Sequence, residues 1–522
     1  MNSTGIMALQ QLLQLLSHKA EKAPVFLKYR SSKNFILFVV SLAVFTDMFL
    51  YSVVVPVAPW ALESRIGLDP SKVQSWVSIS IAVYGAALLV SSPLCGWAAD
   101  RSSSRRTPLL VGLFALLGAT LALCLAKSIW LFVLGRALQG VSASVVWTVG
   151  LALLVDTVGD EQIGQAMGYI GFAMKMGILL GPLLGGVVFQ RSGYFAVFGL
   201  GFAFIGFDIA LRMIIIEQKV AVQWDDPTAV NDSERTTKAD EIQLQTISES
   251  PREADERAHD AIAPISLHQR GYIPNAAANE VEPEQEPETL ERPLGRRWKL
   301  PPFIALLTSR RLLATLWACV VQATLLTSFD SVLPIFVHDT FHWDTVGAGL
   351  IFLPLVIPSL TGPLIGRFVD RYGPKYFTTG GMILACPFLV LLRLIDQNVL
   401  SEKVLLCTLL AFIGFAIDLA LIPLNAEITY IVVAKEKKVP GLFKSGGVYA
   451  QAYGLFNVAY AAGSLLGPLW AGFVTQAVGW GTMAWTLGLF SVVSAVPTFI
   501  WVGGRVKWPN MNMVPVRRVQ TT

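Results

Sequence analysis

Charged side chains are scarce in this chain. Asp, Glu, Lys and Arg make up 15% of its 522 residues, whereas soluble globular proteins average roughly 25%. Hydrophobic residues make up 54% of the chain. Most of the molecular surface is therefore expected to face something other than water. The formal net charge of +4 is too small to indicate a nucleic-acid partner, and none is predicted.

Cysteine and histidine are also few, with five residues of each. His338 and His342 flank acidic residues outside an apolar run, where an exposed loop is favoured over a metal site. The cysteines are odd in number and lie within or beside apolar runs. We interpret them as buried thiols rather than disulfides or zinc ligands: Cys95, Cys124, Cys319, Cys386 and Cys407. We predict no metal and no cofactor.

Motifs of catalysis are missing as well. A membrane-embedded enzyme would need a nucleophile–base pair or a metal cluster at membrane depth, and the sequence offers neither. An ATP-driven pump would need a glycine-rich phosphate loop ending in Gly-Lys-Ser or Gly-Lys-Thr, which is absent. The chain is therefore not expected to be an enzyme. A membrane-embedded receptor or enzyme is kept as an alternative from another functional class.

Long apolar runs are abundant instead. A helix needs about 20 apolar residues to cross the hydrocarbon of a bilayer, and the alternation typical of membrane β-barrels is absent. We therefore predict an all-α membrane protein with twelve transmembrane helices in two pseudo-symmetric six-helix bundles, at residues 35–216 and 304–503. The twelve runs begin near Phe35, Val73, Thr107, Ile129, Ile163, Tyr194, Leu312, Thr345, Tyr376, Lys403, Gly446 and Gly481.

The remaining segments are expected to lie in the cytoplasm. Residues 1–34 and 504–522 are predicted tails, and residues 217–303, rich in acidic residues, Pro and Ser, are a predicted disordered linker. Basic residues gather before the first run and after the second and eighth. Because such residues concentrate on the cytoplasmic side of membrane helices, both termini are placed there. The plasma membrane is the expected location, with a vacuolar or vesicular membrane as the alternative.

The two halves repeat one another. Pro93 to Gly96 followed by Asp100 and Arg101 is echoed by Pro363 to Gly366 followed by Asp370 and Arg371. Repeats at matching positions of two six-span halves indicate a substrate site between them, near the midplane. A second repeat of small residues is expected to allow close helix packing and gating: Gly177, Gly181 and Pro182 in the fifth span, and Gly467 and Pro468 in the eleventh.

Residues 366–375, Gly-Arg-Phe-Val-Asp-Arg-Tyr-Gly-Pro-Lys, resemble the signature loop of the major facilitator superfamily. The resemblance implies a clasp made by two cytoplasmic gating loops, whose Gly residues let helices approach: Gly96, Asp100, Arg101, Gly366, Asp370 and Arg371. The first copy departs from the pattern, with Ser102 to Ser104 where Gly is usual. Residues 135–140 are similar to a motif of proton-coupled members, and residues 177–186 to a pattern of exporters.

A narrower likeness begins in the first span. Thr46 to Pro56 resembles the vesicular amine transporters and their fungal relatives, in the twelve-span drug:proton antiporter group. Asp330 and Asp418 fall where that group has carboxylates. Asn457 stands where the amine transporters have a carboxylate, and Tyr84 where they have a Lys. The resemblance implies an exporter that differs from the amine transporters at these two positions.

The ionisable residues within the spans are the candidate site. Each costs about 2.5–3.5 kcal/mol to insert into a membrane, so each needs a reason. Asp47, Asp330 and Asp418 are predicted to line the central cavity, and at least one to exchange a proton for substrate. The alternative is a structural polar contact between helices.

Other polar residues in the spans leave more than one role open. Arg136 either tunes the proton affinity of a carboxylate or forms a structural ion pair. Lys175 either neutralises a cavity Asp, contacts an acidic substrate group or extends to the membrane interface. Asn457 either hydrogen-bonds into the cavity or bridges helices. Asp208 and Arg212 are four residues apart, which favours an intrahelical pair.

These features predict a proton-coupled antiporter that exports a small organic compound, such as a drug, an amine or a secondary metabolite, by alternating access. Its partners would be the small-molecule substrate, protons and the lipid bilayer, and it would act as a monomer. A proton-coupled or facilitative importer of a nutrient is the alternative within transport.

Overall fold

The computed structural model describes residues 26–101, 105–158, 163–216, 221, 307–438 and 447–503. The predicted linker, apart from residue 221, lies outside the described residues, as do the C-terminal tail and most of the N-terminal tail. The side chains of Asp100, Arg101 and Asp370 also lie outside them. The described parts of both halves form one compact unit.

The first half is a bundle of helices that begin close to the predicted positions. Short pieces are α2 (Leu27–Arg30), α4 (Ala58–Trp60) and the π-helix η1 (Ala61–Arg65). The long helices are α3 (Lys33–Val53), α5 (Pro70–Arg101), α6 (Arg106–Cys124), α7 (Ile129–Val145), α9 (Ile163–Ser192) and α10 (Tyr194–Ile214). A second π-helix, η2 (Val146–Gly150), joins α7 to α8 (Leu151–Val158) within the fourth span.

The second half repeats this plan, and the all-α prediction is confirmed, because the described residues contain no β-strand. Its long helices are α14 (Arg310–Phe341), α18 (Pro374–Leu391), α19 (Leu400–Lys438), α20 (Gly447–Val478) and α21 (Trp480–Trp501), with a 3-10 turn η4 (Leu392–Leu394) after α18. The eighth span is divided into α15 (Thr345–Leu350), α16 (Phe352–Val356), the 3-10 turn η3 (Ile357–Thr361) and α17 (Gly362–Tyr372).

Eleven helices of the described residues are long and apolar enough to cross a membrane. The divided eighth span, which has a shorter apolar segment from Thr345 to Thr361, supplies the twelfth crossing of the predicted fold. Pro354 and Pro358 lie within this segment. Because proline has no N–H to donate and its ring obstructs the preceding turn, the two prolines account for the break.

The two predicted gating loops are largely helical. Gly96 lies within α5, and Gly366 lies within α17. The break after the second repeat comes at Gly373, whose φ of 83° ends α17. A Cβ atom added to Gly96 or Gly366 would meet no atom within 4 Å. Among the described residues, no atom therefore crowds the Cβ position of either glycine, and their predicted role in close helix contact stays a prediction.

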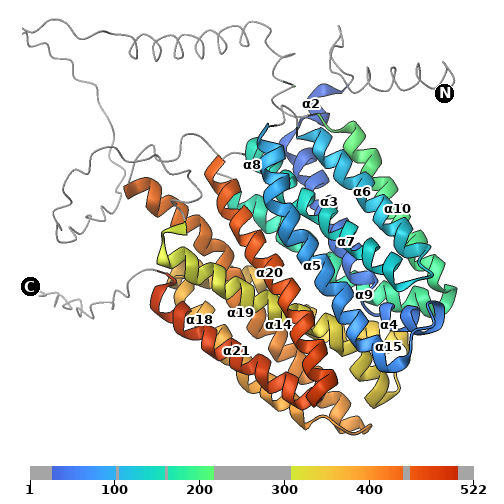
Figure 1. Cartoon of the computed structure of the whole chain (residues 1–522). Helices are drawn as coiled ribbons and strands as arrows, with labels where there is room; N and C mark the ends of the chain where they lie inside the picture. Colours follow the sequence, from blue (N-terminus) through green and yellow to red (C-terminus); the bar gives the residue numbers. More distant parts are fainter. Residues whose placement is uncertain are drawn as a thin grey trace, which may run out of the picture. The chain divides into compact units, whose positions relative to one another are not determined.

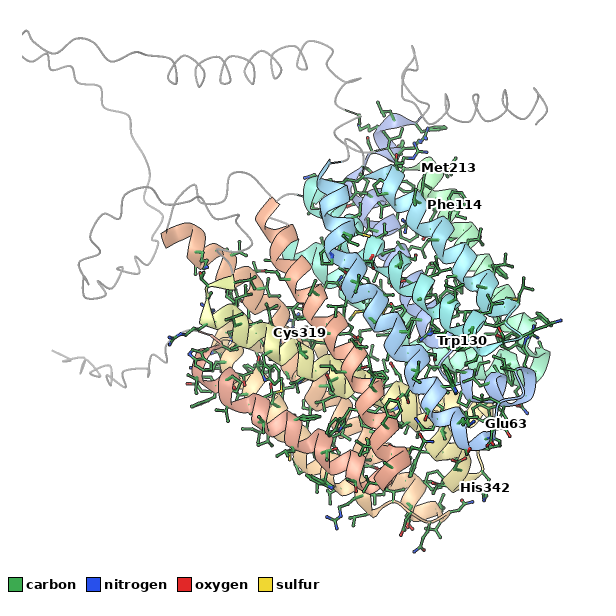
Figure 2. All side chains as sticks on the ribbon, in the orientation of Figure 1. Glu63, Phe114, Trp130, Met213, Cys319 and His342 are labelled. Atoms are coloured by element: carbon green, nitrogen blue, oxygen red, sulfur yellow. The ribbon has the colours of Figure 1, made fainter. Side chains whose placement is uncertain are left out.

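The bundle has two ends, which we name by what lies there. The terminal end carries α2 and the last residues of α10, with Met213 nearby (Figure 1, Figure 2). The loop end carries Glu63 and His342 (Figure 2). Between them, large apolar side chains face outward, as Phe114 and Trp130 do. An exposed apolar belt of this kind is what a lipid-facing surface requires.

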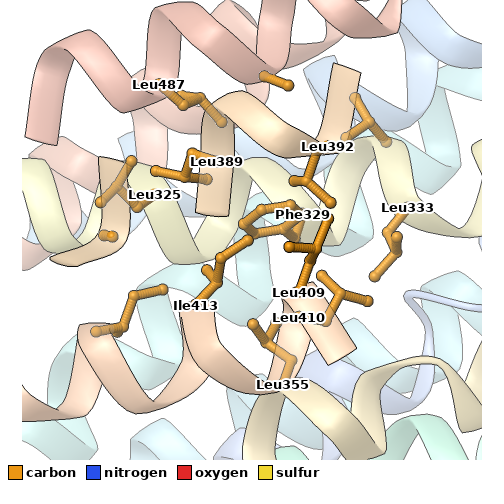
Figure 3. Packing of buried hydrophobic residues seen from close by; sticks show 14 of the residues in the cluster. Leu325, Phe329, Leu333, Leu355, Leu389, Leu392, Leu409, Leu410, Ile413 and Leu487 are labelled. Carbon is orange, nitrogen blue, oxygen red and sulfur yellow. The ribbon is translucent and has the colours of Figure 1, made fainter. Parts of the chain in front are cut away.

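Each half has its own apolar core. In the second half Phe329 of α14 is fully buried, and Leu355, Leu389 and Leu409 from three further spans pack in the same cluster (Figure 3). The cysteines are free thiols, as predicted, but only Cys124 and Cys319 are buried and the others are half-buried. His338 lies in the last turns of α14 rather than in a loop, since that helix continues to Phe341.

In each half, the first helix and the last residues of that half are connected at the terminal end. The Arg30 carbonyl accepts a hydrogen bond from the Ile216 amide at 3.1 Å, and the Arg30 Nε donates to the Ile214 carbonyl at 2.7 Å. In the second half Glu427 of α19 pairs with Arg311 at the start of α14. The Glu427 Oε1 also accepts a hydrogen bond from the Gly503 amide, just after α21, at 2.8 Å.

The halves meet along two seams. The first seam is formed by α5 and α20, which run side by side (Figure 1). At its loop end Gln476 contacts Ser75 and donates to the Ser71 carbonyl at 2.8 Å. The second seam is formed by α9 with α15 and α16. There the Thr345 hydroxyl donates to Gln190 at 3.1 Å. Both seams are therefore closed toward the loop end.

Candidate functional site

Tyr51 and Asp330 connect the two halves in the middle of the bundle. The Tyr51 hydroxyl of α3 donates to the Asp330 Oδ2 of α14 at 2.8 Å. The Arg136 guanidinium of α7 lies 5.0 Å from the centre of the Tyr51 ring and 5.5 Å from that of Tyr84. A guanidinium over aromatic faces is attracted by their negative π-surfaces. The predicted carboxylate and the predicted cation are therefore brought together by two tyrosines.

Arg136 is almost completely enclosed, with 1% of its surface exposed. Its Nη1 donates to the Gln139 side chain at 2.9 Å and to the Tyr51 carbonyl at 3.3 Å. Its Nε atom and the Tyr84 hydroxyl have no hydrogen-bond partner among the described residues. Buried polar groups are normally paired, so these two are suited to receive a polar group of a substrate.

Lys175 and Asp418 form an ion pair between the halves. Lys175 belongs to α9 and Asp418 to α19, 243 residues further along the chain. The Asp418 side chain is 3% exposed and that of Lys175 is 21% exposed. Of the alternatives that the sequence left open, this geometry corresponds to neutralisation of a buried Asp by Lys175. A charge buried in this way requires a partner.

Asp47 lies inside the first half, with 2% of its surface exposed. Its Oδ2 accepts a hydrogen bond from the Trp147 Nε1 at 3.3 Å. Trp147 belongs to the π-helix η2. Asp47 also interacts electrostatically with the positive charge of Arg212 on α10. Both of these interactions of Asp47 lie within the first half, whereas the bonds of Asp330 and Asp418 cross to it from the second half.

Asn457 completes the contacts between the halves on the first seam. Its Nδ2 donates to the Ser92 hydroxyl of α5 at 3.2 Å. Asn457 is buried, and Ser92 is 2% exposed. The contact lies further toward the terminal end than the Ser75–Gln476 contact, since α5 runs from the loop end to the terminal end.

The Gly-Pro motifs lie against the first helix of their own half. A Cβ atom on Gly177 would come within 2.8 Å of the Phe45 carbonyl, and one on Gly467 within 2.5 Å of the Thr324 carbonyl. Such distances leave no room for a side chain. In both halves a serine hydroxyl also donates to a glycine carbonyl of the motif at 3.1 Å. Pro182 and Pro468 lie inside α9 and α20.

Two further ion pairs lie within the halves. The Arg212 Nε donates to Asp208 at 3.1 Å, which is the intrahelical pair that the spacing predicts, and Arg212 also donates to the Leu109 carbonyl at 3.0 Å. The Glu427–Arg311 pair, with 2.8 Å between Oε2 and Nη2, was not predicted. A carboxylate within the apolar run of α19 was the signal that could have revealed it.

Sequence reasoning also missed the partners of the predicted residues: Tyr51, Ser92 and Trp147. Tyrosine, serine and tryptophan are common in membrane helices, so no sequence signal separates these from their neighbours. The described residues hold no group of three or more His, Cys, Asp or Glu side chains that could bind a metal ion. The arrangement places three buried carboxylates, those of Asp47, Asp330 and Asp418, each beside a hydrogen-bond or ion-pair partner.

Comparisons with known proteins identify the family of the chain. The family model of the Major Facilitator Superfamily matches residues 40–448. A protein of Metarhizium rileyi named MFS-type transporter ppzB is 30% identical over 94% of this chain and 99% of its own length. A probable vesicular acetylcholine transporter-B of Danio rerio is 21% identical over 95% of this chain and 86% of its own length.

A solved structure shares the fold. The human organic anion transporter MFSD10 (TETRAN) superposes with a TM-score of 0.55 at 16% identity, covering 89% of this chain and 99% of that one. At this identity the likeness concerns the fold alone. The twelve-crossing architecture, the family model over most of the chain and full-length relatives named as transporters lead to one conclusion: this chain is a transporter that belongs to the major facilitator superfamily.

Proposed function

We propose that this transporter exports a small organic compound in exchange for protons, with both termini in the cytoplasm. One observation carries the proposal: two of the candidate carboxylates, Asp330 and Asp418, hold bonds that bridge the halves. A proton that reaches either carboxylate therefore acts directly on the contact between the bundles.

The coupling follows from the strength of these bonds. A hydrogen bond to an ionised group is roughly twice as strong as one between neutral groups. Protonation of Asp330 weakens its bond to Tyr51, and protonation of Asp418 removes the charge that holds Lys175. Both events favour separation of the halves on the side of the bundle where they occur. Rocking of one half against the other then moves the substrate site from one membrane face to the other.

Direction and substrate class have weaker support. The exporter-type pattern at residues 177–186 favours export. The basic residues gathered at the terminal end favour a cytoplasmic position for that end. The name of the zebrafish relative refers to acetylcholine, a small organic compound. The enclosed guanidinium of Arg136 and the hydroxyl of Tyr84 add polar groups that such a compound can meet.

The test is transport driven by a pH gradient in proteoliposomes, with a panel of fluorescent organic compounds. We expect wild-type flux to follow the gradient. Asp418→Asn should lower gradient-driven flux by roughly tenfold or more, the effect of losing about 1.4 kcal/mol. Flux of the wild type that is indifferent to the gradient would contradict antiport and would favour a facilitator.

Asp69→Asn is the matched control, since it removes a carboxylate outside the spans. The Ser71 amide and hydroxyl donate to Asp69 at 2.9 and 2.7 Å. These hydrogen bonds hold the pKa of Asp69 below its ordinary value. Asp69 therefore stays ionised at physiological pH and cannot carry the exchanged proton. Its substitution should leave the response to the gradient unchanged.

A further inference from the structure

The π-helix η2 lies in the middle of the fourth span, between α7 and α8. Before it, α7 is held tightly: a Cβ atom on Gly140 would lie 2.3 Å from the Tyr84 carbonyl of α5, and one on Gly135 would lie 2.7 Å from Leu123. After it, α8 packs against α3 of its own half and against α20 of the other half. A π-turn is one extra residue inserted into an α-helix, and such turns are frequent at functional sites.

The π-turn presents Trp147 to Asp47. The indole N–H donates to the Asp47 carboxylate at 3.3 Å, and Asp47 is 2% exposed. This bond is charge-assisted while Asp47 is ionised and weakens when Asp47 takes up a proton. The indole is then free to leave the carboxylate. Trp147 is itself a residue of the π-turn.

Other charged or titratable groups surround Asp47 on the helices packed about it. Arg212 of α10 interacts with it electrostatically and is itself paired with Asp208. Tyr84 of α5 also interacts with it. Arg106 of α6 lines the same small cavity as Arg212 and donates to the Met213 carbonyl. The charged groups among these are held by partners of their own, which leaves Trp147 as the donor that Asp47 can release.

We propose that η2 is a relay, in which Trp147 senses the charge of Asp47 and the π-turn passes its change to the contact between α8 and α20. Trp147 is thus a positioning residue for proton coupling, and the inference rests on the proposed antiport. In the ionised state the Trp147–Asp47 bond holds the π-turn. In the protonated state the segment shifts toward continuous α-helix, and α8 moves relative to α20.

The test follows the backbone directly and needs no substrate. Hydrogen–deuterium exchange of residues 144–154 is measured in nanodiscs at a series of pD values, corrected for the intrinsic exchange rate. We expect protection to rise roughly tenfold on acidification of the wild type, since in a continuous α-helix every interior backbone N–H donates to the carbonyl four residues earlier. Asp47→Asn should show the high protection at every pD.

Trp147→Phe keeps an aromatic ring and removes the N–H donor. Because no bond then holds the π-turn, this variant should show high protection at every pD, as Asp47→Asn does. Trp470→Phe is the matched control, since the Trp470 Nε1 donates to Thr486 at 3.1 Å within the other half. That variant should follow the wild type. Deletion of Thr148, which removes the extra residue of the π-turn, should give high protection throughout.

Two results would overturn the relay: a Trp147→Phe profile that coincides with the wild type, or an Asp47→Asn profile that still depends on pD. Gradient-driven flux of the same proteins separates this failure from that of the proposed function. If flux ignores the gradient while protection follows pD, antiport is wrong and the relay stands. If flux follows the gradient while protection is constant, antiport stands and the relay is wrong.

Discussion

At the scale of single residues, the Tyr51 side chain links three groups of the candidate site. Its hydroxyl donates to Asp330, its ring centre lies 4.6 Å from that of Tyr84, and its face receives Arg136. One side chain therefore joins the second half to a cation and an aromatic ring of the first. Removal of the hydroxyl alone should abolish the hydrogen bond to Asp330 and keep the ring contacts with Tyr84 and Arg136.

Tyr51→Phe is expected to slow gradient-driven transport roughly tenfold, because a hydrogen bond to a charged group contributes about 1.5–3 kcal/mol. The ring contacts with Tyr84 and Arg136 are kept. In an Asp330→Asn background the same substitution should have no further effect, since Tyr51 acts through that carboxylate. Flux through the single and double variants checks this. Losses that simply multiply would show that the two residues act independently.

Sequence reasoning succeeds at this scale where partners are near in the chain. The Asp208–Arg212 pair could be predicted because residues four apart share one face of a helix. The Lys175–Asp418 pair could not, since its members lie on helices of different halves and their meeting depends on the packing of both bundles. The same holds for Trp147, whose partner is set by the π-turn.

At the scale of elements, α9 shows two kinds of glycine. A Cβ atom on Gly177 would clash with the backbone of α3, whereas one on Gly171, six residues earlier, would meet nothing within 4 Å. The difference follows from the position of α3, against which only the later part of this stretch is tightly packed.

Gly177→Ala should therefore lower the thermal stability of the protein, since overpacking typically costs about 1–3 kcal/mol. Gly171→Ala should leave stability equal or slightly raised, because alanine favours helix more than glycine does. Melting curves in detergent compare the two variants. Equal melting temperatures would mean that α3 can move away from α9 at little cost.

The positions of the helices were predictable, because apolar runs of membrane-spanning length have few alternatives in a bilayer. The division of the eighth span and the π-turn of the fourth were not. Pro354 lies in the divided eighth span, whereas Pro182 lies within the continuous helix α9. Whether a proline divides a helix is therefore decided by its neighbours in space.

At the scale of the whole molecule, the contacts between the halves combine two chemistries. The loop end of the first seam is joined by neutral amide and hydroxyl groups, as between Ser75 and Gln476. The carboxylates lie deeper, at Asp330 and Asp418. A proton can therefore change the interior contacts while leaving the loop end chemically untouched, so that the loop end opens only when the halves move as bodies.

Ser75→Cys combined with Gln476→Cys should trap the closed loop end. Oxidation or a short bifunctional thiol reagent should join the two positions and reduce transport roughly tenfold or more. For the oxidised disulfide, a reductant should restore transport. Each single cysteine variant is the control and should transport with or without oxidant. Undiminished transport by the joined protein would show that this contact need not open during the cycle.

The ties at the terminal end have a consequence for how the molecule is held together. Arg30 fastens the start of the first half to its last residues, and Glu427 fastens the start of the second half to the residue after α21. In each bundle, the first and last segments are thus joined by contacts of that bundle alone. The peptide connection between the halves sets their ratio at one to one. The contacts of Arg30 and Glu427 hold the first and last segments of each bundle together.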